Sequence, residues 1–454
     1  MLACIDSPPT ILRTAWRDPV DALSPYADEP FALCLLSDGE GERGRWSYLA
    51  RQPSRTLTVA ASDSADPFAE LRALVGPAGP VAPDAPPFQG GVVGLASYEL
   101  GDRVERLGLS RLAPWPDLAC ARYDILLAFD HLAHEVLAIG PDEAAAGSAL
   151  AWLDAAPLAF TDGRLADELR VPPPCQHEAA VAEVVERIAA GEIFQANLAR
   201  SWSGRLADGA RPFDLFRRLA SASVAPFAAY LRLPGLALVS NSPERFLKVT
   251  PQGGRLAAET RPIKGTVPRG ATPEEDERLV ATLAASLKDR AENLMIVDLM
   301  RNDLARVSTP GTVRVPELFE VERYANVSHL VSTVTAELAP GKDAVDLLAA
   351  AFPPGSITGA PKVQAMKVIA ELEPPRGPFF GAMFWAGADG GFDSNVLIRT
   401  AAFTEDAEGW RFEARAGGGI VADSEPVAER LETDAKIAAL LGALSGEPKP
   451  GAVS

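Results

Sequence analysis

The sequence predicts a mixed α+β protein, and two observations support this prediction. Before residue 150, short apolar runs rich in β-branched and aromatic residues alternate with loops rich in Pro, Gly and Asp, which is typical of antiparallel sheets. Beyond residue 171, amphipathic helical patterns alternate with further strand-like runs. The runs expected to form strands in the first part are 31–37 (FALCLLS), 56–61 (TLTVAA), 123–130 (YDILLAFD) and 135–140 (EVLAIG).

A proline cluster and the helical patterns divide the chain. The cluster at 171–176 (VPPPCQ) separates the two parts, because proline interrupts both helices and sheets. We therefore predict an N-terminal sheet-rich portion over 1–170 and a second portion over 171–445. The tail over 446–454 has the composition of a disordered terminus. Helices are expected at 177–192, 273–286, 286–307 and 424–444.

Charge and cysteine content exclude several classes of function. The chain has 43 Lys and Arg residues against 61 Asp and Glu residues, and its net charge of -18 disfavours nucleic acids and anionic membranes as partners. The four cysteines show no CxxC spacing, which favours a reducing compartment. Because there is no basic leader and no apolar run of about 18 residues, we expect a soluble, cytoplasmic protein with no membrane partner.

Lys264 stands in an unusual setting. It lies in the segment 259–270 (ETRPIKGTVPRG), between a proline-fixed approach and a glycine. A solvated lysine has a pKa of about 10.4, and its ammonium form cannot attack an electrophile. A lysine becomes a nucleophile only where burial or neighbouring cations lower that value, so its surroundings decide its role.

Carboxylates on the last helical segment share one face. Glu425, Glu429, Glu432 and Lys436 follow one another at steps of four, three and four residues. This pattern is also that of ordinary surface ion pairs. The three glycines at 417–419 favour a ligand site, because they offer backbone N–H groups to an anion beside the acidic face.

The segment 286–307 carries a second candidate carboxylate. Glu292 precedes an apolar stretch, where an acidic side chain is costly unless it is paired or binds a metal. Two carboxylates from different helices, with water in the remaining positions, suit Mg2+. The alternative is a structural network in which Asp298, Arg301 and Asp303 join helices.

Two further segments offer groups to an anionic ligand. Residues 352–366 (FPPGSITGAPKVQAM) run from a loop into a helix and carry Ser356, Thr358 and Lys362, although such loops are also ordinary connectors. Arg399 lies within the apolar run 396–403 (VLIRTAAF). An arginine in that setting needs a carboxylate partner, from the protein or from a ligand.

Eight motifs, taken in order, resemble those of the chorismate-utilising enzymes. The resemblance is strong over about 190–440, and the FQGGVVGLASYE and FALCLLS segments extend it toward the N-terminus. It implies a large α+β fold in which two antiparallel sheets pack face to face, with helices outside and the active site in a cleft. The motifs are SNSPERF, RPIKGT, DRAENLMIVDLMRNDLARV, HLVSTV, GSITGAPK, IRTA, AGGGIVADS and ETDAK.

Within this family, the PIKGT motif with Lys264 is similar to that of the branch that makes 4-amino-4-deoxychorismate on the route to p-aminobenzoate and folate. Relatives that make anthranilate usually have alanine at this position, in a PIAGT motif, where this chain reads PIKGT. The resemblance implies that the Lys264 amine adds to C2 of chorismate while the C4 hydroxyl leaves, and that ammonia then adds at C4. It also implies that Glu244 of SNSPERF protonates the departing hydroxyl.

The resemblance also implies a metal, substrate contacts and a partner. Glu292 and Glu432 match ligands of Mg2+, with Glu429 as a further or water-mediated partner. Ammonia is implied to come from a separate glutamine amidotransferase subunit. The substrate contacts implied are Arg399 for the enolpyruvyl carboxylate, Gly418, Gly419 and Lys436 near the ring carboxylate, Thr358, and Trp385, which replaces a tyrosine common in the family.

Three alternatives remain at this point. Anthranilate synthase component I has the same architecture, but Lys264 argues against it. Isochorismate and salicylate synthases usually carry a lysine base where this chain has Gln195, and a neutral amide cannot activate water as a base. A catalytically silent homologue is disfavoured by the intact set of Glu244, Lys264 and Arg399 with the metal carboxylates. His329 is retained, but it suits the loss of pyruvate in the anthranilate branch.

Overall fold

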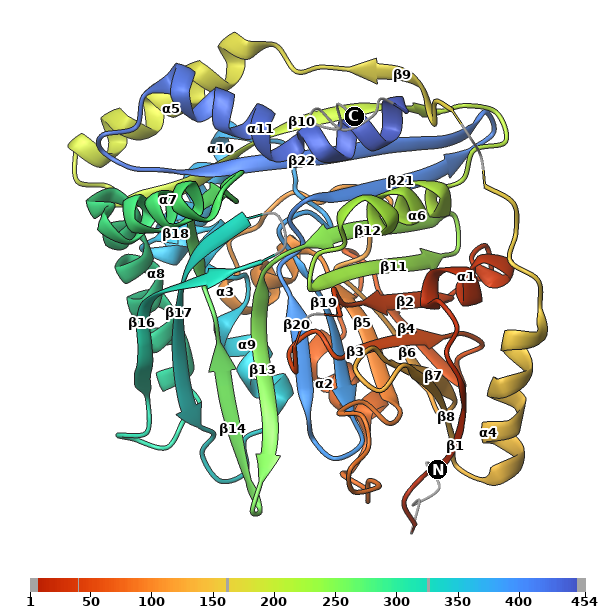
Figure 1. Ribbon diagram of the computed structural model, residues 1–454. Helices are drawn as coiled ribbons and strands as arrows, with labels where there is room; N and C mark the ends of the chain where they lie inside the picture. The colour runs from red at the N-terminus through yellow and green to blue at the C-terminus, as the bar shows by residue number, and fades with distance from the viewer. Residues whose placement is uncertain (1–6, 40, 161–162, 325–326, 447–454) are drawn as a thin grey trace.

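Two antiparallel β-sheets pack face to face, with most helices on their outer surfaces (Figure 1). The computed structural model describes residues 7–39, 41–160, 163–324 and 327–446. The predicted α+β architecture of two packed antiparallel sheets is confirmed. Twelve strands among the described residues form the first sheet, in the order β1 (Thr10–Ala15), β8 (Glu135–Gly140), β7 (Leu126–Asp130), β3 (Trp46–Ala50), β2 (Leu33–Leu36), β11 (Phe227–Leu233), β12 (Leu236–Ser242), β21 (Thr400–Asp406), β22 (Gly409–Ile420), β10 (Gln195–Leu206) and β18 (Gly359–Ala360), with β9 (Ala166–Arg170) also paired to β10.

The second sheet has ten strands within the described part of the chain. Strands from both sides of residue 170 pair in each sheet, since β2 pairs with β11 and β5 pairs with β19. The boundary near residue 171 therefore marks a position along the chain and no spatial division. The order is β15 (Ile263–Pro268), β17 (Val327–Glu337), β14 (Arg255–Thr260), β13 (Arg245–Gln252), β20 (Phe392–Asn395), β19 (Ala382–Gly387), β5 (Gly91–Ala96), β6 (Leu118–Tyr123) and β4 (Arg55–Val59), with β16 (Arg314–Arg323) paired to β17.

The run 123–130, expected as one strand, is divided between the two sheets. β6 ends at Tyr123 in the second sheet, and β7 begins at Leu126 in the first. Asp124 lies at the crossing, where its carboxylate accepts a hydrogen bond from Arg122 at 3.0 Å. Within β7, Leu126 and Ala128 belong to the core between the sheets, whereas Leu127 and Phe129 belong to the core beneath the outer helices. A strand buried on both faces gives no alternation of polar and apolar residues, so its ends are hard to read from sequence.

The expected helices are present, and their ends follow from capping residues. The Thr272 hydroxyl accepts a hydrogen bond from the Glu275 N–H, and Ser286 does the same for Asp289 one helix later. The last helix ends at Gly446, which is left-handed with φ 74°; residues 447–454 of the expected tail lie outside the described residues. The α-helices are α1 (Pro19–Leu23), α2 (Pro67–Val75), α3 (Asp102–Glu105), α4 (Glu143–Leu150), α5 (Pro174–Ala189), α6 (Pro212–Ser223), α7 (Pro273–Ala285), α8 (Leu287–Ala305), α9 (Ala344–Ala351), α10 (Lys362–Leu372) and α11 (Pro426–Ser445).

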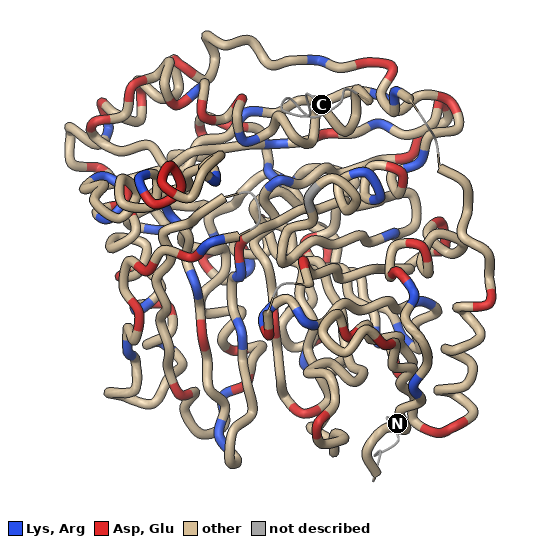
Figure 2. The backbone as a smooth tube through the Cα atoms, viewed as in Figure 1, with Lys and Arg blue, Asp and Glu red and all other residues tan. Residues whose placement is uncertain are grey.

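Charged residues of both signs are interspersed along the chain (Figure 2). None of the helices in the described ranges is long and apolar enough to cross a membrane. Two helices matter for the site. α8 packs on β15 and β17 of the second sheet, and α11 packs on β22 of the first. Side chains from the two sheets therefore meet where these helices approach each other.

Candidate active site

Lys264 lies on β15 and faces α8. Its side chain is only 14% exposed, and its Nζ is 3.8 Å from Oε2 of Glu292. Gly265, the next residue, has φ 80°, a conformation that favours glycine, and a Cβ there would meet the side chains of Leu283 and Asp289. The irregular stretch of β15 that holds Lys264 against the helix, where the pairing with β17 shifts register between Ile263 and Thr266, therefore depends on the glycine of the PIKGT motif.

Glu244 supplies a carboxyl group that holds its proton near neutrality. It lies between β12 and β13 and is 5% exposed. Burial raises its pKa from 4.5 to about 7, against the opposing effects of a hydrogen bond from Ser356 and the charges of Lys264 and Lys436. A carboxylic acid with this pKa can donate a proton at neutral pH.

Glu292, Glu429 and Glu432 come together from α8 and α11, around a lysine that sequence reasoning missed. The Nζ of Lys288 lies 4.0 Å from Oε1 of Glu292 and 3.8 Å from Oε1 of Glu429. Burial would raise the pKa of Glu432, but the charges of Lys436, Lys288 and Lys264 outweigh it, and the pKa lies below its usual value. The only sequence signal for Lys288 was its place four residues before Glu292 on one helix face.

The predicted glycines lie beside these charged groups, within β22 and not in a loop. Paired to β10, Gly418 lies opposite Leu198 and Gly419 lies opposite Asn197. A Cβ on Gly419 would lie 2.3 Å from Nε2 of Gln195 and 3.2 Å from Nζ of Lys264, so no side chain fits there. A Cβ on Gly418 would meet Oε2 of Glu429 at 3.1 Å. The glycines bring β22 close enough for Lys264 and Glu429 to share one site.

Two other groups close this part of the site. Lys436 forms an ion pair with Glu432 at 2.7 Å and donates a hydrogen bond to the Gly417 carbonyl at 2.9 Å. Gln195 is fully buried, and both polar atoms of its amide lack hydrogen-bond partners among the described residues. A buried amide without partners is costly, which indicates that a ligand or water meets it when the site is filled.

Arg399 is a half-buried cation with no counter-ion among the described residues. Burial lowers its pKa, and its guanidinium forms no ion pair or hydrogen bond with the residues that the structure describes. Its φ of 51° is uncommon for a residue other than glycine. His329 lies close by, buried and hydrogen-bonded to Thr266 at 2.8 Å, and its pKa is lowered to about 4 by burial and then by the Arg399 charge. Arg399 is thus arranged to receive an anion beside a neutral histidine.

The segment 352–366 divides between structure and site. Lys362 forms an ion pair with Asp303 at 2.7 Å, so its charge joins α10 to α8 and does not serve a ligand. Thr358 is fully buried, and its hydroxyl donates to the Pro354 carbonyl at 3.1 Å. Ser356 is the member of this segment that contacts Glu244.

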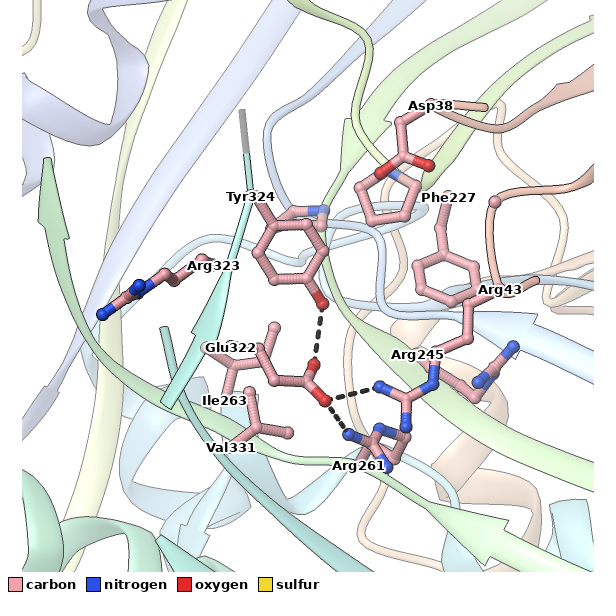
Figure 3. A pocket seen from close by; sticks show the side chains of 13 residues that line it. Asp38, Arg43, Phe227, Arg245, Arg261, Ile263, Glu322, Arg323, Tyr324 and Val331 are labelled. Carbon is pink, nitrogen blue, oxygen red and sulfur yellow. Dashed lines mark hydrogen bonds and ion pairs between the residues drawn. The ribbon is translucent and has the colours of Figure 1, made fainter. Parts of the chain in front are cut away.

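Two cavities adjoin the cluster without containing it. The first, of about 300 Å³, is lined by Ile263, next to Lys264 in the chain, and by Glu322, which binds Arg43, Arg261 and Tyr324 (Figure 3). The second, of about 270 Å³, is lined by Trp385 with Leu36 and Ser37. Neither lining includes Lys264 or Glu244. Trp385, predicted to contact the substrate, lies in the wall of a cavity whose lining does not include those two residues.

A carboxyl group with a raised pKa, an amine, carboxylates and an arginine without a counter-ion among the described residues lie between the two sheets, an arrangement suited to a small anionic molecule. Residues 32–442 match the family of chorismate binding enzymes. The chain belongs to that family, and the resemblance predicted from its motifs is confirmed.

Individual relatives in this family catalyse different reactions. Aminodeoxychorismate synthase component 1 from Klebsiella aerogenes is 40% identical over 95% of this chain and 98% of its own length. Anthranilate synthase component 1 from Streptomyces coelicolor is also 40% identical, over 89% of this chain and 81% of its own. Among solved structures, anthranilate synthase component I from Streptococcus pneumoniae TIGR4 has a TM-score of 0.76 at 29% identity and covers 88% of this chain and 93% of that chain. Overall likeness thus includes two reactions, and the choice between them rests on the site.

Proposed function

We propose that this protein converts chorismate and ammonia into 4-amino-4-deoxychorismate. The observation that carries the proposal is the position of Lys264, largely buried and 3.8 Å from Glu292, at the place where anthranilate-forming relatives usually have alanine. An amine there can act on a substrate that an alanine could only contact. Glu244, whose raised pKa of about 7 is opposed in part by the Lys264 charge, is the matching acid.

The reaction takes two displacements. In the first, the lone pair of the Lys264 amine forms a bond to C2 of chorismate, both ring double bonds shift, and the C4–O bond breaks as Glu244 protonates the departing hydroxyl to water. In the second, ammonia bonds to C4, both double bonds shift back, and the C2–N bond to Lys264 breaks. The two steps together replace one difficult displacement with two easier ones, which is the advantage of a covalent intermediate.

The substrate's two carboxylates match two parts of the site. Arg399 has no counter-ion among the described residues and would bind the enolpyruvyl carboxylate through its planar guanidinium. The ring carboxylate would lie by Gly418, Gly419 and Lys436. Thr358, whose hydroxyl donates to the Pro354 carbonyl, would lie beside the substrate in this region.

Mg2+ is the metal proposed for the carboxylate cluster. No group of three or more potential metal ligands is already assembled among the described residues, but Glu292 and Glu429 both pair with one cation, the Lys288 ammonium, whose charge also lowers the pKa of Glu432. Oxygen donors of this kind suit Mg2+. When bound, Mg2+ would neutralise the ring carboxylate. Lys436 and the two glycines of β22 hold the same region of the substrate in place.

Ammonia would come from a separate glutamine amidotransferase subunit. The names of the relatives, as component 1 of their enzymes, support a second component. Cys34 and Cys120 are buried, and burial raises the pKa of both thiols, so neither is suited to attack glutamine. Free thiols at Cys34, Cys120 and Cys175 agree with a reducing, cytoplasmic setting.

Product analysis tests the proposal. The purified chain is incubated with chorismate, Mg2+ and an ammonium salt at neutral pH, where Glu244 still holds its proton in part, and the products are identified by mass spectrometry. We expect 4-amino-4-deoxychorismate without anthranilate. Anthranilate as the main product would overturn the proposed reaction in favour of the second candidate, which the 40% identity to the Streptomyces coelicolor protein supports. Isochorismate or salicylate would overturn both.

A further inference from the structure

Lys288 differs from the other two lysines of the site in its partners. Each of its ion pairs within the described residues goes to a proposed metal carboxylate, Oε1 of Glu292 at 4.0 Å and Oε1 of Glu429 at 3.8 Å. Lys264, by contrast, also lies against Gly419 and Glu244, and Lys436 donates to the Gly417 carbonyl. Lys288 thus does nothing in the site except neutralise carboxylates.

The two oxygens of Glu292 face different lysines. Oε2 lies 3.8 Å from Lys264, whereas Oε1 points to Lys288. Lys264 is 14% exposed and fixed on a strand, but Lys288 is 57% exposed and lies in the first turn of α8. Its four-carbon stem can therefore carry the charge out to solvent without disturbing the fold.

A divalent cation and the Lys288 ammonium cannot occupy the same space between Glu292 and Glu429. Both are compact cations, and at such short separation their repulsion is unfavourable even beside carboxylates. Ion pairs as exposed as those of Lys288 are weak, so a divalent cation can displace the lysine. Without any cation, the three carboxylates would repel one another across the α8–α11 contact.

We propose that Lys288 is a tethered counter-ion: it neutralises Glu292, Glu429 and Glu432 when no metal is bound, swings into solvent when a divalent cation enters, and so sets metal affinity by direct competition. This inference rests on the metal site of the proposed function. It does not depend on which product the enzyme makes.

Titration calorimetry with MgCl2 tests the proposal on the full chain without substrate. We expect Lys288→Met to bind Mg2+ about five- to tenfold more tightly than the wild type, because the two weak ion pairs of Lys288 no longer compete with the metal. In thermal unfolding, the metal-free variant should have a lower Tm and a larger rise on adding Mg2+. Lys342→Met is the matched control, since Lys342 forms the same i,i+4 pair with Asp346, at 3.2 Å, outside the site; it should bind Mg2+ as the wild type does.

Lys288→Arg separates direct competition from a general effect of charge. If Lys288 only contributed a distant positive charge, arginine would bind Mg2+ as lysine does. Direct occupation predicts weaker binding, because the guanidinium holds carboxylates through paired hydrogen bonds. Equal affinities for wild type, Met and Arg variants, or no saturable Mg2+ binding in any folded protein, would overturn the proposal. If the Mg2+ affinities of the Met variant, the wild type and the Arg variant fall in the expected order but the product is anthranilate, only the proposed reaction is overturned.

Discussion

The two sides of the candidate site treat a glutamate in opposite ways. On the side of β12 and β13, burial outweighs two lysines and raises the pKa of Glu244 to about 7. On the side of α11, three lysines outweigh burial and lower the pKa of Glu432. The same residue type is thus kept as a proton donor at one end and as an anion at the other. The difference shows that the balance between burial and neighbouring lysine charges sets which form of a glutamate is favoured, since Lys264 and Lys436 act on both residues and Glu244 is the more buried.

Removing Lys264 should have the largest effect. We expect Lys264→Ala to lower kcat for aminodeoxychorismate by more than about 1000-fold, because loss of a nucleophile costs at least as much as loss of a general acid. Quenched-flow product analysis measures this. Lys248→Ala is the control, since Lys248 lines the second cavity away from Glu244. Turnover of Lys264→Ala within tenfold of the wild type would contradict the covalent route.

Removing the proton of Glu244 should follow closely. Glu244→Gln should lower kcat by about 100- to 10,000-fold, the usual contribution of a general acid. In the wild type, kcat/KM should fall as pH rises through about 7, because the active carboxyl group loses its proton there. The descending limb should be absent from the residual activity of the glutamine variant. A limb that persists in that variant at the same pH belongs to another group and contradicts the assignment.

Arg399 should trade stability for binding. Arg399→Met removes a half-buried cation that has no counter-ion in the described part of the chain, so we expect a higher Tm together with a KM for chorismate about 10- to 100-fold higher. Differential scanning calorimetry and steady-state kinetics measure the two effects. Arg411→Met, which removes an exposed ion pair to Asp406, should change neither by much. A lower Tm for Arg399→Met, with KM unchanged, would make Arg399 a structural residue.

Glu244 should also cost stability above neutral pH. Its pKa is about 7 in the folded protein and about 4.5 when solvated. Between these values the unfolded chain has lost the proton that the folded chain keeps, so the free energy of unfolding falls as pH rises from 4.5 to 7. At pH 8, Glu244→Gln should therefore be more stable than the wild type by on the order of 1–3 kcal/mol, with little difference at pH 4. Urea unfolding at both pH values checks this, and equal stability at pH 8 contradicts it.

The two glycines of β22 should differ in a way that sharpens the comparison. Gly419→Ala places a Cβ 2.3 Å from the Gln195 amide and should lower both kcat and Tm, because Gln195 is fully buried and cannot move away. Gly418→Ala meets the end of the Glu429 side chain at 3.1 Å and should have the smaller effect on both. Gly442→Ala is the control, because a Cβ there meets nothing within 4 Å. Equal effects at 418 and 419 would show that the contact with Gln195 is not decisive.

Sequence was most informative where a local rule governs structure. The ends of α7, α8 and α11 follow capping residues and prolines, and the face shared by Glu429, Glu432 and Lys436 follows helical spacing. Long-range contacts could not be predicted from the sequence. The split of 123–130 between sheets, the place of 417–419 within a strand and the use of Lys362 by Asp303 each depend on a partner far away in the chain.

The site shows the same limit. The roles of Lys264 and Glu244 came from motif resemblance, and no spacing rule predicts that burial raises the pKa of Glu244. The spacing of Lys288, four residues before Glu292, was visible in the sequence, but its contact with Glu429 depends on a second helix, α11. The expectation that Trp385 contacts the substrate came from its position in a motif, and no local rule predicts the cavity that it lines from β19.

The most direct test of the central claim is to trap the covalent intermediate. Wild-type protein is mixed with chorismate and Mg2+ in the absence of ammonia, quenched with acid, digested and analysed by mass spectrometry. A nucleophilic Lys264 predicts a peptide containing residues 263–268 that has gained the mass of one chorismate less one water, absent from Lys264→Ala and greatly reduced in Glu244→Gln. The claim would be contradicted by an unmodified Lys264 peptide from protein that makes aminodeoxychorismate once ammonia is added, if the Lys264→Ala variant makes the product equally well.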